Sequence, residues 1–331
     1  MEKKSKFIIL VITVFLSFMA WSLLRIINVH LLSTKQMPKF SLPQGKVLFI
    51  VGQDRDTIDA YVNSINITPG GFMVYTSIQN MDGLYSPVDY GGGVQHFQDL
   101  VDRYPNTVIQ IGLYMVGALD GVIEGLYDMN VGKLAEWIKK TDRPVYLRIG
   151  YEFDGSHNSY EPDKYVKAYR YIVDKLRKGG VDNVAYVWHS CACYTPRPIM
   201  DWYPGDRYVD WFAISYFNRR TKYMDIMAQL AAKHNKPLMI AESTPCGIGT
   251  YYADYAWDRW FRPFFDFVIE KDVKVVCYIN SNWEAQQMWK GQGWQDARVQ
   301  ANEIIKKRWL NEINKERYLQ SSPNLYEILG Y

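Results

Sequence analysis

The sequence is poor in the side chains that most often bind metal ions. Its 331 residues include five histidines and four cysteines, Cys191, Cys193, Cys246 and Cys277. Their spacing does not match the paired cysteine and histidine ligands of structural zinc sites. We therefore expect no metal site, and a metal-dependent hydrolase, which needs clustered His and Asp ligands, is disfavoured. Two states of the cysteines stay open: a disulfide between Cys246 and either Cys191 or Cys193, or buried free thiols.

The sequence also lacks a basic excess and a glycine-rich phosphate loop. Residues 36–331 carry 33 basic and 34 acidic side chains, so the formal charge of +3 arises in the first 35 residues. A run of Lys or Arg that would bind nucleic-acid phosphates is missing. No dinucleotide-binding fingerprint follows the first predicted strand. We therefore expect neither nucleic acid as a partner nor an organic cofactor.

The N-terminus contains a long hydrophobic run. Residues 7–24, FIILVITVFLSFMAWSLL, carry no charge and follow Lys3, Lys4 and Lys6. As a helix this run would span about 27 Å, close to the thickness of the hydrocarbon core of a bilayer. The pattern predicts an uncleaved membrane anchor over residues 1–35 and a tether over 36–45, with the rest of the chain outside the cytoplasm. Secretion after cleavage is the alternative, disfavoured by the length of the run and a poor small-x-small site.

The remaining sequence alternates between strand-like and helix-like segments. Short runs rich in Val, Ile, Tyr and Phe are typical of strands buried on both faces of a parallel sheet. Eight such runs with helical segments between them predict a single (β/α)₈ TIM barrel over residues 46–312, followed by a tail over 313–331. A doubly wound open sheet is the competing fold. The eight runs are 46–52, 71–78, 107–116, 144–153, 184–190, 209–217, 236–243 and 273–280.

Polar and aromatic side chains gather where these predicted strands end. In a (β/α)₈ barrel the functional residues lie at the carboxyl ends of the strands. Aromatic residues make up 15% of the chain, which suits either an aromatic core or surfaces that stack on sugar rings. The side chains at the predicted rim are Glu152, Asp154, Trp188, His189, Ser190, Tyr216, Asn218, Glu242, Ser243, Asn280, Asn282, Trp283 and Glu284.

Two glutamates at this rim suit the cleavage of a glycosidic bond. That chemistry needs one acid to protonate the leaving oxygen and a second carboxylate to attack the anomeric carbon or to activate water. Glu242 directly follows the apolar segment 237–241, which would hold a nucleophile rigidly, and Glu152 lies between Tyr151 and Phe153, a setting that suits a general acid. A single glutamate after a strand is more often a helix cap or a surface charge. Two in the same context favour catalysis, with Asp154 in a supporting role.

Several neighbours of the two glutamates are candidate site residues. Arg148 lies inside a predicted strand, and a buried guanidinium needs an acidic partner, so it either holds the carboxylates or contacts the substrate. Tyr216 is placed to donate a hydrogen bond to Glu242. Trp283, in the polar segment 281–289, is a candidate sugar platform. The predicted substrate-binding set is Arg148, Tyr216, Trp283, Trp188, His189 and Tyr114.

Three segments in the expected order resemble a known group of enzymes. The segments PVYLRIGYEFDG (144–155) and KPLMIAEST (236–244) are similar to the acid/base and nucleophile segments of retaining (β/α)₈ glycoside hydrolases. The segment WYPGDRYVDWFAISYF (202–217) resembles strand 6 of glycoside hydrolase family 26. That family contains β-mannanases, β-1,3-xylanases and mixed-linkage glucanases. The resemblance covers roughly residues 100–300.

The resemblance implies a role for each matching residue. Glu152 would be the general acid/base and Glu242 the nucleophile of a retaining enzyme, with Tyr216 contacting the nucleophile and Trp283 forming the floor of the sugar subsite. It implies an endo-acting hydrolase of a polysaccharide, first a β-mannan. Tyr151 stands where the mannanases usually have histidine, and β-1,3-xylan or another exopolysaccharide is the alternative substrate. An inactive carbohydrate-binding barrel is the alternative from another class of protein.

Overall fold

The computed structural model describes residues 38–331 of the chain. They form one compact unit, Pro38–Tyr331. The predicted membrane anchor over residues 1–35 lies outside the described residues. Within residues 38–331, no helix is both long and apolar enough to cross a bilayer.

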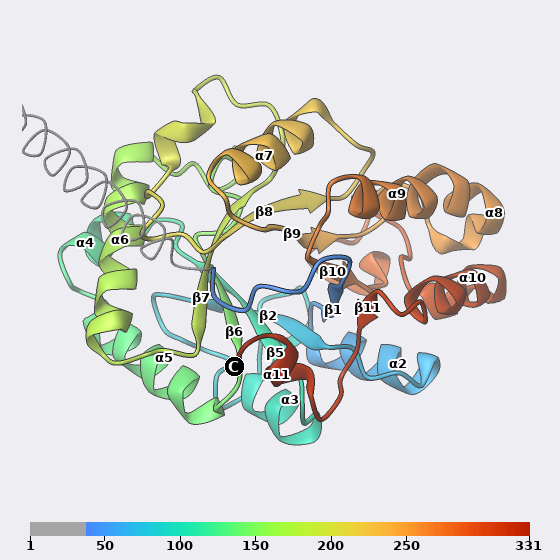
Figure 1. Ribbon diagram of the computed structural model, residues 1–331, viewed down its shortest axis with the longest axis horizontal. Helices are drawn as coiled ribbons and strands as arrows, with labels where there is room; N and C mark the ends of the chain where they lie inside the picture. Colours follow the sequence, from blue (N-terminus) through green and yellow to red (C-terminus); the bar gives the residue numbers. More distant parts are fainter. Residues whose placement is uncertain (1–37) are drawn as a thin grey trace, which may run out of the picture. The chain divides into compact units, whose positions relative to one another are not determined.

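The described residues contain eight parallel strands that close into a barrel (Figure 1). Each of these strands pairs with the one that follows it along the chain. The last strand, β10, also pairs with the first, β1, through Val275 and Leu48, which closes the sheet. The predicted (β/α)₈ barrel is therefore confirmed, and the open sheet is excluded. The strands are β1 (Val47–Gly52), β2 (Gly71–Ser77), β5 (Val108–Tyr114), β6 (Val145–Ile149), β7 (Val184–Ser190), β8 (Trp211–Tyr216), β9 (Leu238–Ser243) and β10 (Val275–Ile279).

Helices cover the outside of the barrel (Figure 1). In α6 the Glu161 carboxylate accepts a hydrogen bond from the Lys164 amide, and Pro162 occupies the first turn, as expected of a helix start. The helices are α2 (Arg55–Ile65), α3 (Phe97–Arg103), α4 (Leu119–Ile123), α5 (Asp128–Thr141), α6 (Pro162–Lys178), α7 (Lys222–Lys233), α8 (Ala253–Ala256), α9 (Arg262–Glu270), α10 (Glu303–Ile313) and α11 (Leu325–Ile328). Short strands β3 (Val88–Asp89) and β4 (Val94–Gln95) form a hairpin after β2.

Strand residues alternate between two separate hydrophobic cores. Side chains such as Val187 on β7 and Ala213 on β8 fill the inside of the barrel. Their neighbours along the chain, such as Trp188 and Ile214, pack between the strands and the helices. Successive strand side chains point to opposite faces, so this alternation decides which residues at each carboxyl end can face the barrel interior.

Residues 38–45, the described part of the expected tether, and the expected tail pack onto the amino end of the barrel. Phe40 and Leu42 are buried in the inner core together with Leu325 and Leu329 of the C-terminal segment. Strand β11 (Tyr318–Leu319) pairs in parallel with β1. Both segments therefore belong to the barrel and close its floor.

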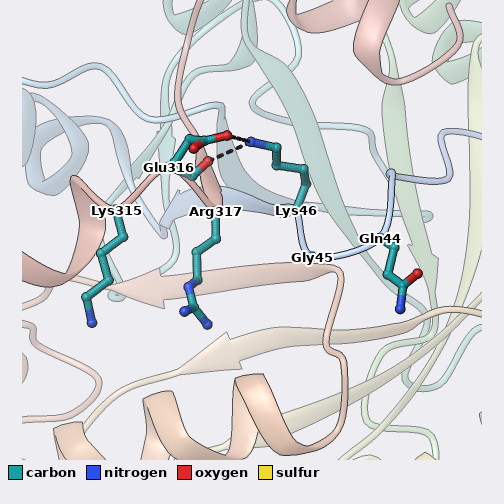
Figure 2. Close-up of a pocket in the computed structure, with 6 residues that line it drawn as sticks. All are labelled: Gln44, Gly45, Lys46, Lys315, Glu316 and Arg317. Atoms are coloured by element: carbon teal, nitrogen blue, oxygen red, sulfur yellow. Dashed lines mark hydrogen bonds and ion pairs between the residues drawn. The ribbon is translucent and has the colours of Figure 1, made fainter.

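A surface pocket lies at this amino end (Figure 2). Residues 44–46 before β1 and 315–317 before β11 line it, and Lys46 donates a hydrogen bond of 2.8 Å to the Glu316 carboxylate across it. The Glu316 side chain is 95% exposed. This pocket is at the opposite end from the carboxyl ends of the strands, so it does not hold the predicted site.

Candidate active site

Glu242 faces the barrel interior because strand β9 contains an irregularity. Ile214 of β8 pairs with Ile240, but the next residue, Ser215, pairs with Glu242, so Ala241 is an extra residue in the ladder. Ala241 packs into the inner core, and strict alternation would turn Glu242 to the outer face. The bulge directs Glu242 inward as well, and bulges of this kind often re-aim side chains beside active sites.

A buried ion pair holds Glu242. The Arg148 guanidinium of β6 is fully buried and pairs with the Glu242 carboxylate through Nη1. Its Cζ lies 5.1 Å from the centre of the Tyr75 ring and 5.2 Å from that of Tyr151. Gly112 on the neighbouring β5 makes room, since a Cβ there would lie 2.4 Å from the Tyr75 ring and 2.8 Å from Arg148. Arg148 thus holds the carboxylate, one of the two roles predicted from the sequence.

The charges around Glu242 act in opposite directions on its acidity. Burial raises the pKa of the Glu242 carboxyl above its ordinary value, and the negative charge of Glu152 raises it further. The Arg148 charge and a hydrogen bond from the Tyr75 hydroxyl oppose this increase. Burial and the Glu242 charge raise the pKa of Tyr75 well above the usual range, so its hydroxyl stays protonated and donates. Arg148 and Tyr75 are therefore the two partners that favour the ionised form of Glu242.

A chain of hydrogen bonds joins Glu242 to Glu152. Arg148 Nη1 lies 3.3 Å from His189 Nδ1, which must accept because a guanidinium only donates. His189 Nε2 then donates to Ser215 Oγ at 3.0 Å, and this hydroxyl donates to Glu152 Oε1 at 2.6 Å. Burial and the charge of Arg148 lower the pKa of His189 well below its usual range, consistent with a neutral imidazole. One guanidinium nitrogen therefore contacts Glu242 directly and reaches Glu152 through two side chains.

Glu152 sits just after β6 in an uncommon backbone conformation. Its φ is 50°, in the left-handed region that non-glycine residues rarely adopt, and only 7% of the residue is exposed. The Asn158 side-chain amide fixes the loop by donating to the Glu152 carbonyl at 3.0 Å. The outer carboxylate oxygen, Oε2, lies 2.9 Å from Nε2 of His157. The loop thus presents one carboxylate oxygen to Ser215 and the other to His157.

The hydrogen bonds of the Asp154 carboxylate go to the end of β7 and the loop after it, and not to Glu152 or Glu242. Its Oδ2 accepts from the Ser190 hydroxyl at 2.7 Å and its Oδ1 from the Cys191 amide at 2.8 Å, which ties the end of β6 to the end of β7. Burial raises the pKa of Asp154 to about 6. Cys191 forms a disulfide with Cys193, and Cys246 and Cys277 are free. Of the two alternatives left open by the sequence, the pairing with Cys246 is therefore wrong, and free thiols hold for Cys246 and Cys277 alone.

Among the described residues, one group of side chains has the spacing of a metal site: Asp154, Cys191 and Cys193. The ligand atoms of Asp154, Cys191 and Cys193 lie within 4.8 Å of one another. The two sulfurs are bonded to each other, however, and a disulfide offers no thiolate to a metal ion. In this oxidised form the cluster does not fit a metal.

Two predicted site residues face away from the barrel interior. Tyr216 packs against the rings of Trp260, Phe264 and Phe267 in the outer core. Trp188 also lies in the outer core, stacked on Phe153 with ring centres 4.4 Å apart. The tyrosine that contacts Glu242 is therefore Tyr75 and not Tyr216. Both corrections have the same cause, because Tyr216 and Trp188 occupy outward positions in the alternation of their strands.

The aromatic residues of the rim are arranged differently from the prediction. Trp283 follows β10, is 2% exposed, and donates from Nε1 to the Thr244 hydroxyl at 3.1 Å. Its ring packs against Trp289 and Trp294, with centres 5.2 Å and 4.9 Å away. These two rings are half-buried, so they, rather than Trp283, offer surface to a sugar. Tyr114, at the end of β5, is 37% exposed, and its contact with a substrate stays a prediction.

Three residues of the site escaped the sequence interpretation: Tyr75, Ser215 and His157. Alternation would have found Ser215, because it lies on the same face of β8 as the inward residue Ala213. No sequence pattern points to Tyr75, since its hydrogen bond to Glu242 depends on closure of the barrel. His157 belongs to an irregular loop, where the two-residue alternation of strand side chains does not apply.

Two carboxylates inside the carboxyl end of a closed (β/α)₈ barrel, with aromatic rings beside them, define a glycoside hydrolase. The chain is 34% identical over 319 residues to a β-1,3-xylanase from Vibrio sp, covering 88% of this chain and 69% of that protein. It is also 34% identical over 319 residues to a β-1,3-xylanase from Alcaligenes sp, covering 88% and 68%. Residues 107–276 match the model of glycosyl hydrolase family 26. The chain belongs to that family.

Solved structures agree on the fold. A family 26 β-mannanase from Bacteroides ovatus superposes with a TM-score of 0.63 at 15% identity, covering 85% of this chain and 93% of that one. A modular endo-β-1,4-mannanase from Cellulomonas fimi superposes with a TM-score of 0.62 at 15% identity, covering 86% and 74%. At this identity the likeness supports the barrel and not the substrate.

The two tyrosines provide a matched pair of variants. Tyr75→Phe removes a hydrogen bond to a buried carboxylate, which is worth about 1.5–3 kcal/mol, so we expect kcat/KM on a polysaccharide substrate to fall about 10- to 100-fold. The Tyr75 hydrogen bond lowers the pKa of Glu242, so its loss raises that pKa. The acidic limb of the pH profile should therefore move to higher pH. Tyr216→Phe keeps the packing of the outer core and should leave kcat/KM unchanged. Equal losses in the two variants would contradict the assignment of Tyr75.

Proposed function

We propose that the chain is a retaining β-glycosidase that cleaves a polysaccharide internally, with β-1,3-xylan as the first candidate substrate. Glu152 protonates the glycosidic oxygen while Glu242 attacks the anomeric carbon, and the leaving chain departs. Glu152 then takes a proton from water, the water oxygen attacks the anomeric carbon, and the bond to Glu242 breaks. Atoms and charges balance over the two steps, and one water molecule is consumed.

The observation that carries this proposal is the different environment of the two carboxylates. Glu242 is buried against a permanent cation, which keeps a nucleophile ionised and fixed. Glu152 accepts from a neutral hydroxyl on one oxygen and reaches the partly exposed His157 with the other. Different surroundings for two neighbouring carboxyl groups are what an acid and a nucleophile require.

The choice of xylan rests on sequence similarity over most of the chain. Both curated relatives described above are β-1,3-xylanases. β-Mannan, which the sequence motifs favoured first, is the second candidate. Tyr151 supports this order, because it stands where the mannanases usually have histidine and lies beside Arg148 in the site.

A substrate panel tests the proposed function. Purified protein is incubated with β-1,3-xylan, β-1,4-xylan, β-1,4-mannan and mixed-linkage β-glucan, and products are identified by mass spectrometry. We expect a ladder of short xylo-oligosaccharides from β-1,3-xylan, with the first product in the β-anomeric form by proton NMR. An α-anomeric first product would contradict double displacement. Cleavage of mannan alone would select the second candidate, and binding without any cleavage would support the inactive carbohydrate-binding barrel.

A further inference from the structure

His157 lies at the open side of Glu152. Its side chain is 58% exposed, whereas the Glu152 side chain is 9% exposed. The imidazole rests over Gly155, where a Cβ would lie 2.5 Å from its Cε1 and 2.9 Å from its Nδ1. The turn that carries it is closed by hydrogen bonds from the Gly155 amide to the Glu152 carbonyl, at 2.9 Å, and from the Asn158 amide to the Gly155 carbonyl, at 3.0 Å. The loop is therefore folded so that His157 returns to the glutamate five residues before it.

The two oxygens of Glu152 have different access to a substrate. Oε1 is held by the Ser215 hydroxyl, which is itself buried and bonded to His189. Oε2 faces the partly exposed imidazole of His157. Of the two oxygens, Oε2 is therefore the one on the side of the exposed imidazole. With Oε2 as the oxygen that gives its proton to the leaving oxygen, that proton passes through the atom that His157 contacts.

The charges that face His157 favour its protonated form. The hydrogen bond to Glu152 raises the pKa of His157 above its ordinary value, while partial burial opposes the increase. The negative charges of Glu242, from β9, and Asp154, from the same loop, raise it further. His189, from β7, faces His157 but is neutral because burial and the charge of Arg148 lower its pKa.

We propose that His157 is a positioning residue that shares one proton with Glu152, supplying it for the first step of each catalytic cycle and taking one back after the second. The inference rests on the proposed function. Before the first step the proton moves from His157 Nε2 to Glu152 Oε2, leaving a neutral imidazole and a neutral carboxyl group. Glu152 passes this proton to the leaving oxygen. In the second step Glu152 takes a proton from the attacking water and returns it to His157, so the pair ends as it began.

Removal of the imidazole should change the pH profile of the enzyme. A carboxyl group alone loses its proton at lower pH than an imidazolium paired with a carboxylate. For His157→Gln we therefore expect the alkaline limb of kcat/KM on the polysaccharide to move to lower pH. At pH 7.5 the value should fall about tenfold or more, since general acid catalysis contributes about 10²- to 10⁴-fold. Gly155→Ala, which displaces the imidazole without removing it, should move the limb in the same direction by less.

An activated substrate separates proton supply from a structural role. The leaving group of 2,4-dinitrophenyl β-xylobioside departs without protonation, so its kcat/KM should be nearly the same for wild type and His157→Gln. The control is His234→Gln, which removes another histidine paired with a carboxylate, Asp206 at 2.7 Å, at the far end of α7. This variant should keep the wild-type pH profile on the polysaccharide.

The outcomes distinguish the inference from the function on which it depends. An unchanged alkaline limb in His157→Gln, or equal losses on the polysaccharide and on the aryl glycoside, would overturn the role of His157 and leave the hydrolase intact. If Glu152→Gln kept wild-type activity on the polysaccharide, the acid assignment itself would be wrong. Wild-type protein without activity on the panel would refute the proposed function before His157 is considered.

Discussion

Glu242→Gln is expected to lower kcat on the polysaccharide on the order of 10⁴-fold or more, because an amide oxygen is a far weaker nucleophile than a carboxylate oxygen while the shape of the side chain is kept. The measurement is release of reducing ends at saturating substrate. Glu152→Gln is the matched variant, and its loss should depend on the leaving group. We expect it to be large on the polysaccharide and small in kcat/KM on 2,4-dinitrophenyl β-xylobioside. Glu242→Gln should lose activity on both substrates.

Added azide assigns the two roles by stereochemistry. In Glu242→Ala the anion can occupy the space of the missing carboxylate and attack the anomeric carbon from that face, giving an α-glycosyl azide from the aryl glycoside. In Glu152→Ala the covalent intermediate still forms, and azide should attack it from the opposite face to give a β-glycosyl azide. The same azide product from both variants would show that the carboxylates do not play these separate roles.

Much of the site followed from the sequence because its main signals are local. Each candidate catalytic glutamate lies at the end of a short apolar run, and in a chain with eight such runs these are typical of buried parallel strands. In a parallel barrel those runs must end at one rim, which brings Glu152 and Glu242 together whatever the details of packing. Arg148 was also recognisable, because a guanidinium in a buried strand needs an acidic partner, and Glu242 is that partner.

The errors come from alternation and its interruption. Reading every residue at a strand end as a rim residue included Trp188 and Tyr216, which the two-residue period sends to the outer core. Applied strictly, the same period would have lost Glu242, because the bulge at Ala241 that turns it inward leaves no mark in the sequence. Register therefore decides which of two neighbouring residues reaches the site, and register depends on the partner strand.

Other contacts depend on closure of the chain in three dimensions. Tyr75 reaches Glu242 from β2, a strand distant in sequence, and a side chain at Gly112 would collide with the Tyr75 ring and with Arg148. The disulfide joins Cys191 to Cys193 because they share one turn, and distances between other cysteines could not be judged from spacing. The packing of Phe40 against the barrel floor likewise depends on the C-terminal segment that covers it.

Arg148→Met is expected to destabilise the protein by about 3–5 kcal/mol at neutral pH, because it leaves the Glu242 charge buried without its partner. The measurement is urea denaturation of the purified protein. Arg298→Met is the matched control. Arg298 pairs with Asp296 at 2.7 Å, but both side chains are partly exposed, so its loss should cost about 1 kcal/mol or less. Equal costs for the two variants would contradict the burial of the ion pair.

The pH dependence of this loss follows from the acidity of Glu242. Its pKa in the folded protein is raised above its ordinary value, so its contribution to stability is fully present below the ordinary pKa and is lost as pH rises through the folded value. Without Arg148 the folded pKa rises further, and the loss extends to higher pH. Acidification should therefore restore much of the stability of Arg148→Met.

The double variant with Glu242→Gln removes both charges, so at neutral pH it should be more stable than Arg148→Met alone and lack this pH dependence. A double variant as unstable as the sum of the two single variants would mean that the charges do not interact, and that some other contact of Arg148 stabilises the barrel.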